Sequence, residues 1–332
     1  MVKRAAVAAL VVAATLPVAG CGARRSAVQA YPTTPGHDAR PLPPPGRVTA
    51  RIHLRHRPTG VTFGRGRLWV TADDGTVTAV DPATDRPVKT TAVGRWPLQV
   101  AFEPHALWVA NSDDDTVTRL DPPSDRAVQT IHVGVHPVGV AAANGALWVA
   151  NGFDDTVTRI DTRRHAVAAT IPVGPAPLDL RSMAVGGGAV WVTAQDALVR
   201  IDPRSDRVAA RIIVHSPAGT AVGDGSVWVS NADDNTLTRI DARTNRIVAR
   251  VPVGQAPTTV AVAAGFVWVV NSAEDTVSQV DPAGNRVVAR IPAGSHTYDL
   301  TAGDGAVWLQ SYADSTVYRI EPSPPDLGGA VA

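Results

Sequence analysis

The fold of this chain is decided by the stretch LWVANGFDDTVTRIDTRRHAVAATIPVG at residues 147–174. Nearly the same text stands at 107–134, LWVANSDDDTVTRLDPPSDRAVQTIHVG, and at 227–254, VWVSNADDNTLTRIDARTNRIVARVPVG. Seven tryptophans mark the repeats, at spacings of 39, 40, 43, 37, 40 and 40 residues: Trp69, Trp108, Trp148, Trp191, Trp228, Trp268 and Trp308. A fixed period of about forty residues is typical of solenoids and propellers.

Each repeat divides into four short runs of β-forming residues. In the third repeat these runs are 137–141, 146–150, 156–161 and 167–173, and glycine, proline, asparagine or aspartate bounds each of them. Runs rich in valine, isoleucine and threonine between such turn residues predict strands. Four strands in about forty residues are one propeller blade. The sequence therefore predicts an all-β, seven-bladed β-propeller with four antiparallel strands per blade, called strands a to d in chain order.

The two ends of the repeat region predict how the ring closes. The last repeat stops after strand c at Arg319-Ile320-Glu321, so its strand d is missing. The text RVTARIHL at 47–54 is similar to RVVARIP at 286–292, which is a strand d. We expect this N-terminal strand to complete the last blade, which removes the free sheet edges at the seam. The propeller then spans 47–321.

The N-terminus has the features of an export signal. Lys3 and Arg4 precede an apolar run at 5–16 that is too short to span a membrane. Val18-Ala19-Gly20-Cys21 resembles the lipobox of bacterial lipoproteins, and Cys21 is the only cysteine. The alternative is an ordinary signal peptide followed by a chance cysteine. The sequence predicts a lipoprotein signal peptide at 1–20, a lipidated Cys21, and export to the outer face of the cell membrane, with the lipid as the membrane anchor.

Two proline-rich segments flank the propeller. Residues 21–46 hold the lipidated cysteine and six prolines, a composition suited to an extended tether. Residues 322–332 are rich in proline and glycine and are expected to be a disordered tail.

The composition limits the classes of partner. The 332 residues are 45% hydrophobic and 18% charged, with a formal net charge of +1. A near-neutral chain lacks the basic surface that draws proteins to nucleic acid, so nucleic acid is not an expected partner. No motif for a phosphate loop, a zinc protease or a cysteine nucleophile is present, and we expect no cofactor and no metal.

The repeat resembles the YVTN-type propeller repeat of YncE-like bacterial proteins. The resemblance lies in Trp-Val-Ala-Asn-Ser of strand b, Asp-Thr-Val-Thr-Arg-Ile-Asp of strand c and Ile-Pro-Val-Gly of strand d, and it covers residues 47–321. It implies the propeller fold. It implies little about activity, because one fold carries many functions.

Residues that recur in every blade are interpreted as scaffold. The tryptophan series offers large apolar area where blades stack. The aspartate that ends strand c, as in Asp161, can bond the backbone of the c–d turn. The acidic b–c loops, such as Asn111-Ser112-Asp113-Asp114-Asp115, are interpreted as side-chain-capped hairpins. Calcium binding is the alternative, although the loops lack the spaced oxygen ligands and the glycine of a calcium loop.

Residues that break the repeat are the candidate site residues. In propellers, strand a lines the central channel, so polar residues at its inward positions stand out. Asp179 and Asp299 occupy a position that is small or neutral in the other blades, and Arg181 follows two residues later in blade 4. These residues predict either ligand recognition in the channel or an ion pair that plugs it.

The d–a loops and positions near them carry the other candidates. These loops share one face with the b–c loops, and several large side chains there fall in blades 7, 1 and 2. The predicted ligand-binding residues on this face are Arg57, Arg95, Trp96, His296, Tyr298 and Tyr312. Aromatic and arginine side chains on one rim favour binding. The alternative is that exposed loops simply vary.

No catalytic residues could be assigned from the sequence. Streptogramin lyases are similar seven-bladed propellers, and that likeness implies an acid/base pair of histidine and glutamate. The chain has three glutamates, of which only Glu274 falls in a top-face loop. We therefore expect a cell-envelope lipoprotein whose propeller binds a small molecule, a glycan or a protein partner. The alternative is a propeller lyase or hydrolase.

Overall fold

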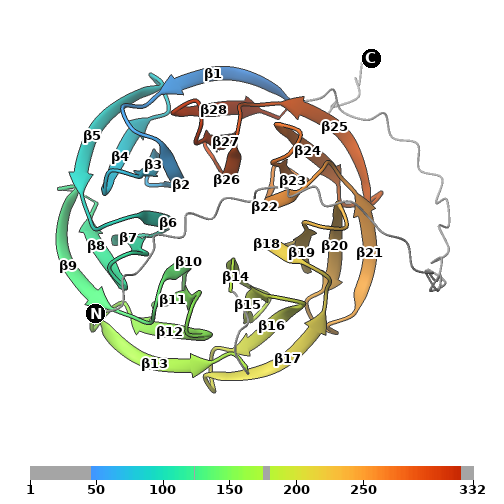
Figure 1. Cartoon of the computed structure of the whole chain (residues 1–332), viewed down its shortest axis with the longest axis horizontal. Helices are drawn as coiled ribbons and strands as arrows, with labels where there is room; N and C mark the ends of the chain where they lie inside the picture. The colour runs from blue at the N-terminus through green and yellow to red at the C-terminus, as the bar shows by residue number, and fades with distance from the viewer. Residues whose placement is uncertain (1–45, 123, 175–179, 323–332) are drawn as a thin grey trace, which may run out of the picture. The chain divides into compact units, whose positions relative to one another are not determined.

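The computed structural model describes residues 46–122, 124–174 and 180–322. These residues form seven four-stranded antiparallel sheets arranged in a ring, and no helix occurs among them (Figure 1). The predicted fold class, an all-β propeller of seven blades, is confirmed. The predicted signal peptide, Cys21 and nearly all of the tether and tail lie outside the described residues.

Each blade is one sheet whose strands follow one another in the chain, except at the seam. The strands of blades 1 to 3 are β2 Pro58–Gly64, β3 Arg67–Ala72, β4 Thr76–Asp81 and β5 Arg86–Ala92; β6 Pro97–Glu103, β7 Ala106–Asn111, β8 Thr116–Asp121 and β9 Arg126–His132; and β10 Pro137–Ala143, β11 Ala146–Asn151, β12 Thr156–Asp161 and β13 Ala166–Pro172. Those of blades 4 and 5 are β14 Met183–Gly186, β15 Ala189–Ala194, β16 Ala197–Asp202 and β17 Arg207–Ile213; and β18 Pro217–Gly223, β19 Ser226–Asn231, β20 Thr236–Asp241 and β21 Ile247–Pro252. Those of blades 6 and 7 are β22 Pro257–Ala263, β23 Phe266–Asn271, β24 Thr276–Asp281 and β25 Arg286–Pro292; and β26 Thr297–Gly303, β27 Ala306–Ser311, β28 Thr316–Glu321 and β1 Arg47–His53.

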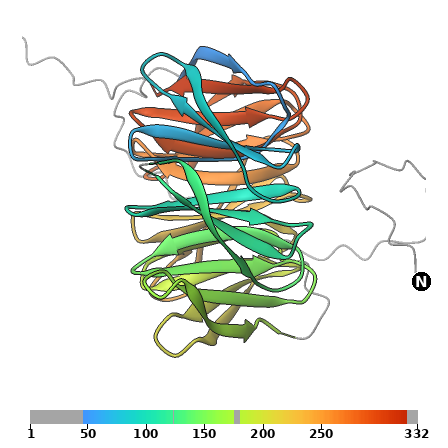
Figure 2. The same cartoon turned by 90° about the vertical axis from the view of Figure 1, so that its left-hand side faces the viewer.

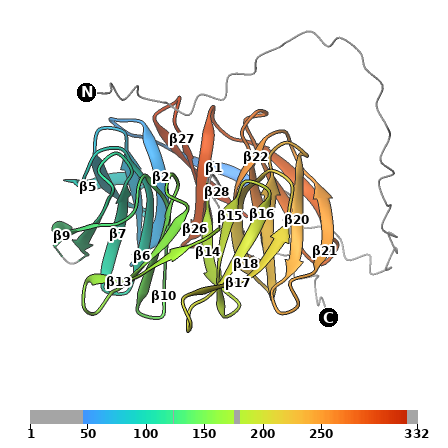
Figure 3. The same cartoon turned by 60° about the horizontal axis from the view of Figure 1, so that its bottom comes forward.

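The first strand of each blade lies innermost and the fourth lies outermost. The inner strands run along the ring axis, whereas the outer strands are steeply inclined to it (Figures 1 and 3). This change of direction is the right-handed twist of each sheet, and it lets neighbouring blades stack face to face. The edge-on view shows the stacked blades without any helix between them (Figure 2).

The ring closes as the sequence predicts. Strand β1 pairs antiparallel with β28, in a sheet of order β1-β28-β27-β26. The pairing skips one residue between Val48 and Ala50. The outer strand of blade 3 skips one residue in the same way where it pairs with β12, between Val167 and Ala169. Strand β1 therefore reproduces the register of an ordinary outer strand, bulge included, although it comes from the other end of the chain.

The core lies between the blades. All seven repeat tryptophans are at most 2% exposed, and each apolar cluster joins residues of two neighbouring blades. Trp108 of β7, for example, packs in one cluster with Val140, Leu147 and Ile160 of the next blade. The predicted stacking role of the tryptophans is confirmed.

Polar repeat residues also serve the scaffold. The Asp161 carboxylate accepts hydrogen bonds from the backbone N–H groups of Arg163 (2.9 Å) and Arg164 (3.0 Å), and these bonds lower its pKa. This confirms the turn role predicted for the aspartate that ends strand c. Arg159, which precedes it in β12, lies over Trp148 and forms an ion pair of 2.8 Å with Asp206 of the next blade.

No helix among the described residues is long and apolar enough to span a bilayer.

Candidate ligand-binding face

The d–a and b–c loops lie on one face of the ring, called here the top face. In blade after blade the carbonyl that precedes strand a accepts the N–H of the first b–c loop residue. This bond measures 3.0 Å from Ser112 N to Trp96 O and 3.2 Å from Tyr312 N to His296 O. The predicted sharing of a face by these loops is confirmed. Because both loops are held by backbone bonds, their side chains are displayed at defined places.

The acidic side chains of the b–c loops cap this arrangement. Asp114 accepts the N–H of Arg95 at 2.7 Å, and Asp154 accepts that of Val135 at 2.8 Å. Asp154 also accepts the N–H of Thr156, two residues further on, at 3.2 Å. The interpretation as capped hairpins is confirmed. Within the described residues, no group of three or more histidine, cysteine or acidic side chains is placed to hold a metal ion.

Large side chains are unevenly distributed around the top face. The residue before strand a is large in blades 1, 2, 3 and 7, where it is Arg57, Trp96, His136 and His296. In blades 5 and 6 the same position holds Ser216 and Ala256. The first b–c loop residue is aromatic only in blade 7 among the described loops, where it is Tyr312. The bulk of this face is therefore concentrated on blades 7, 1, 2 and 3.

Arg57 of blade 1 and Tyr298 and Tyr312 of blade 7 lie on the top face where these two blades adjoin, and we call them the seam patch. The Arg57 guanidinium carbon lies 5.2 Å from the centre of the Tyr312 ring, within cation–π range. Interaction with Tyr312 also raises the pKa of Arg57. Tyr298 is 45% exposed, and its pKa is raised, first by partial burial and then by Tyr312 and Asp275. The seam patch thus presents the guanidinium donors of Arg57 and the neutral phenol of Tyr298 to solvent.

His296 borders the seam patch. Its backbone N–H donates to the Asp275 carboxylate of blade 6 at 3.2 Å, and its carbonyl accepts the N–H of Tyr312. The left-handed backbone of His296, with φ of 52°, turns the chain from the d–a loop into strand β26. Its position is therefore fixed by blades 6 and 7 together.

Asp299 lies beneath the patch, in the wall of the channel. It is 5% exposed and accepts three hydrogen bonds, from Val61 N (2.9 Å), Leu300 N (2.9 Å) and Gln99 Nε2 (3.2 Å). The side chain thus points to strand β2 of the next blade rather than along the open axis. Gly60 and Gly219 occupy the position of Asp299 in blades 1 and 5. A Cβ added to either would also point to the inner strand of the next blade, 2.2 Å from Leu98 O and 2.3 Å from Thr258 O respectively. Asp299 therefore joins blades 7, 1 and 2.

Burial of Asp299 makes the stability of the propeller depend on pH. Desolvation raises its pKa to about 7, against the three hydrogen bonds that lower it. Between pH ~4 and ~7 the unfolded state releases this proton while the folded state keeps it, so the free energy of unfolding should fall as pH rises. Urea unfolding of wild type and Asp299→Asn across this range isolates the effect from other titrating groups. Parallel curves for the two proteins would contradict it.

Three of the remaining predicted site residues, Arg95, Trp96 and Arg181, lie in the described part of the chain, and one lies outside it. Arg95 is engaged by Asp114, with Nε 2.5 Å from Oδ1. Trp96 is partly buried and has a left-handed backbone, with φ of 50°. Arg181 is exposed, and its N–H donates to Thr193 O at 3.2 Å. Asp179 lies outside the described residues, so its predicted pairing with Arg181 stays a prediction.

One exposed aromatic residue of this face was missed from the sequence. Phe153 of the blade 3 b–c loop is 67% exposed and stacks on His136, with ring centres 4.1 Å apart. The signal for it was in the repeat: Phe153 stands where blades 2 and 5 have Asp113 and Asp233.

Two histidine–aspartate pairs bear on the enzyme alternative. His215 Nδ1 lies 3.2 Å from Asp234 Oδ1, and His56 Nε2 lies 3.3 Å from Asp74 Oδ2. In each pair the histidine occupies the d–a loop position of Arg95 and the aspartate occupies the b–c loop position of Asp114. The two pairs therefore repeat a contact that holds these loops together in other blades. Glu274 occupies the same capping position in blade 6. Its carboxylate lies next to Gly254 of the d–a loop, so close that a Cβ added to this glycine would be 2.5 Å from it.

Comparison with known proteins bears on the fold. No protein-family model and no curated protein matches the chain. Among solved structures, a streptogramin B lyase is 15% identical, with a TM-score of 0.73 over 82% of this chain and 97% of its own. Virginiamycin B lyase from Staphylococcus aureus is 14% identical, with a TM-score of 0.70 over 82% and 98%. Hydrazine synthase of Kuenenia stuttgartiensis is 17% identical, with a TM-score of 0.72 over 82% and 97%. These similarities establish the seven-bladed propeller fold and extend no further.

Proposed function

We propose that this propeller is a ligand-binding module of the cell envelope and that its ligand docks on the seam patch. The observation that carries the proposal is the exposed Tyr298 ring, close enough to Tyr312 to interact with it electrostatically, together with the Arg57–Tyr312 pair. Rigid aromatic rings supply contact area at little entropic cost, and arginine supplies a forked donor. Aromatic and arginine anchors of this kind carry most of the energy in binding surfaces.

The scaffold supports binding at this patch. The loops of this face are tied by backbone and carboxylate bonds, so the patch is displayed on a rigid support. The side chains reach it from blades 1 and 7, which the closure of the ring brings together. A small molecule, a glycan or a loop of a protein partner would present the acceptors and flat faces that such a patch can bind. The YVTN-type, YncE-like assignment stays a prediction from the repeat motifs.

The Tyr298→Ala variant tests the patch. Loss of a central aromatic anchor removes at least ~2 kcal/mol of binding free energy, so affinity should fall about thirtyfold. Immobilised protein is presented with a glycan array and a metabolite library, and the retained ligands are then titrated by calorimetry. Val248→Ala, on the outer strand β21 and 55% exposed, is the matched control that should leave affinity unchanged. Ligands retained equally by wild type and Tyr298→Ala would place binding elsewhere.

Anchoring at the outer face of the membrane is the second part of the proposal. It rests on the sequence Val18-Ala19-Gly20-Cys21 and on the proline-rich segment that follows. A lipid on Cys21 together with an extended tether would hold the propeller at the membrane surface without any contribution from its core.

The Cys21→Ser variant tests the anchor. We expect it to leave the membrane fraction and to appear soluble with an unchanged melting temperature, because the substitution lies outside the propeller. Fractionation after a high-salt wash, with wild type alongside, measures this. Retention of Cys21→Ser on the membrane would show that something other than a lipid holds the protein there.

A further inference from the structure

Blade 1 departs from the repeat at two positions that contact each other in other blades. In blades 2, 3 and 6 a glycine of the d–a loop faces an asparagine that ends strand b. A Cβ at Gly94 would lie 2.5 Å from the Asn111 side chain, and one at Gly254 would lie 2.5 Å from that of Asn271. A larger loop residue and the asparagine therefore exclude each other. Blade 1 changes both at once, to Arg55 and Ala72.

The missing asparagine leaves space, and the threonine hydroxyls that it would bond take other partners. In blade 2, Asn111 Nδ2 donates to Thr116 (3.1 Å) and Thr118 (2.8 Å). The corresponding hydroxyls of blade 1 bond elsewhere: Thr76 donates to Asp74 at 2.7 Å, and Thr78 and Thr90 bond each other at 2.9 Å. The space that asparagine fills in blade 2 is part of a pocket of about 240 Å³ in blade 1.

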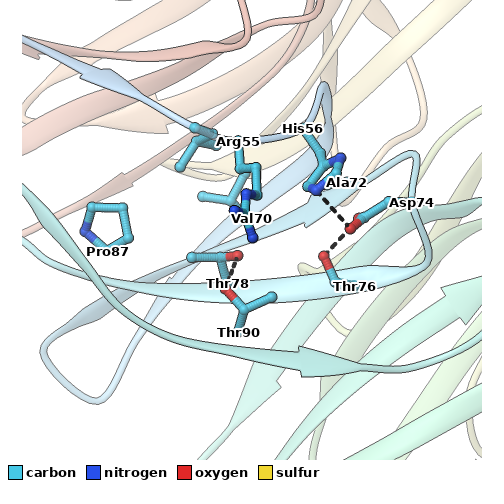
Figure 4. A pocket seen from close by; sticks show the side chains of 10 residues that line it. Arg55, His56, Val70, Ala72, Asp74, Thr76, Thr78, Pro87 and Thr90 are labelled. Atoms are coloured by element: carbon cyan, nitrogen blue, oxygen red, sulfur yellow. Dashed lines mark hydrogen bonds and ion pairs between the residues drawn. The ribbon is translucent and has the colours of Figure 1, made fainter.

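The pocket has one charged wall and one apolar wall. Arg55 and His56 enter from the linker that follows β1, and the three threonines line the opposite side (Figure 4). Apolar surface comes from the side chains of Leu54, Val70, Ala72 and Pro87. His56 is paired with Asp74 at 3.3 Å. Arg55, by contrast, forms no ion pair with any residue in the described part of the chain.

These features select a class of ligand. A guanidinium without an acidic partner is free to bind an anion, and its fork matches a carboxylate. Asp74, in the same pocket, disfavours a doubly charged anion such as phosphate by like-charge repulsion. The volume is below the ~300–1,000 Å³ of drug-sized sites, so only a small molecule fits. One proton of the Thr78–Thr90 pair remains available to a polar group of the ligand.

We propose that this pocket is a binding site for a small monocarboxylate, held by Arg55 at its carboxylate and by Val70, Ala72 and Pro87 along its apolar body. The site is separate from the seam patch and does not depend on the function proposed for it. The coupled exchange of glycine and asparagine for Arg55 and Ala72 is the change in sequence that creates the pocket.

Saturation-transfer NMR on the whole protein tests the site. The probes are propionate, lactate and benzoate, each paired with its neutral amide. We expect the acids to bind and the amides to bind about tenfold more weakly, because the charge-assisted hydrogen bonds to Arg55 are lost. Three results would each overturn the proposal. They are equal binding of acid and amide, competition by inorganic phosphate as strong as that by the acids, and no binding of any acid at about 10 mM.

Two variants localise the binding. Arg55→Gln should weaken the acids about tenfold without filling the pocket. Arg55→Gly combined with Ala72→Asn restores the pair found in three other blades, so it should fold normally while abolishing the signal. Tyr298→Ala is the control that should leave acid binding unchanged. Undiminished binding in both Arg55 variants would refute the site, whatever the outcome for the seam patch.

Discussion

A propeller that begins at residue 55 should lose most of its stability, whereas one that begins at residue 46 should match the full chain. The first deletion removes β1 and leaves the outer edge of β28 without its partner. It also removes Ile52, which is 3% exposed and packs with Trp308 and Val317 in the cluster between blades 7 and 1. Loss of a whole strand at the only seam threatens the entire 5–15 kcal/mol by which a domain is normally stable.

Several contacts at the end of β1 add to this loss. Leu54 N donates to Ser315 O at 2.8 Å, and the His53 ring bonds the Thr316 hydroxyl at 2.9 Å. The exposed edge of β28 would then be open to pairing with other chains, so aggregation should accompany the loss of stability.

Thermal unfolding and light scattering of the two truncated chains measure the effect. Adding a peptide of residues 46–54 to the shorter chain should restore part of the cooperative transition, since the missing strand is a separate segment at the edge of its sheet. Equal melting temperatures for the two chains would show that the ring is held closed without β1.

Trp108→Ala should destabilise the propeller by about 3–5 kcal/mol, the usual cost of deleting a fully buried tryptophan side chain. Trp108 is inaccessible to solvent and contacts Leu147 and Ile160 of the next blade. The substitution leaves a cavity between two blades, and neither sheet can collapse into it without disturbing its neighbours. Urea unfolding measures the change. The midpoint urea concentration should fall, whereas the dependence of the unfolding free energy on urea concentration should stay the same.

Trp96→Ala is the matched control for this experiment. Trp96 is partly exposed and belongs to none of the interblade clusters of the described residues. Its loss should therefore cost far less than that of Trp108. A change of under about 1 kcal/mol for Trp108→Ala would contradict the view that the tryptophan series holds the blades together.

Much of the fold could be predicted from the sequence because each blade is encoded locally. The period of the tryptophans, the β-branched runs and the turn residues specify one sheet in about forty residues, and repetition specifies the ring. The closure of the ring could also be predicted, since the sequence of β1 is similar to that of an outer strand. The acidic loops were interpreted correctly for the same reason: their hydrogen bonds, such as that from Thr156 N to Asp154, join near neighbours.

The candidate site was predictable only in part. Repeat comparison identified Arg57, Tyr298 and Tyr312 as departures from the pattern, and their shared face followed from propeller topology. Phe153 is also a departure from the pattern, but the sequence does not show that it stacks on His136, because the two residues belong to different loops that only the folded blade brings together.

Alternation along a strand predicts which side of the sheet a residue occupies, but only ring closure decides which residues of the two ends meet. Arg57 and Tyr312 are 255 positions apart and come together because blade 7 adjoins blade 1. The same closure brings Asp299 to Val61 N, 238 positions away, and buries the carboxyl group, and this burial raises its pKa although the hydrogen bond from Val61 lowers it. The sequence by itself determined the blades, their number and the strand that closes them, since these depend on local pattern. The tertiary structure alone decided the contacts at the seam, because desolvation and side-chain packing depend on neighbours that no local pattern specifies.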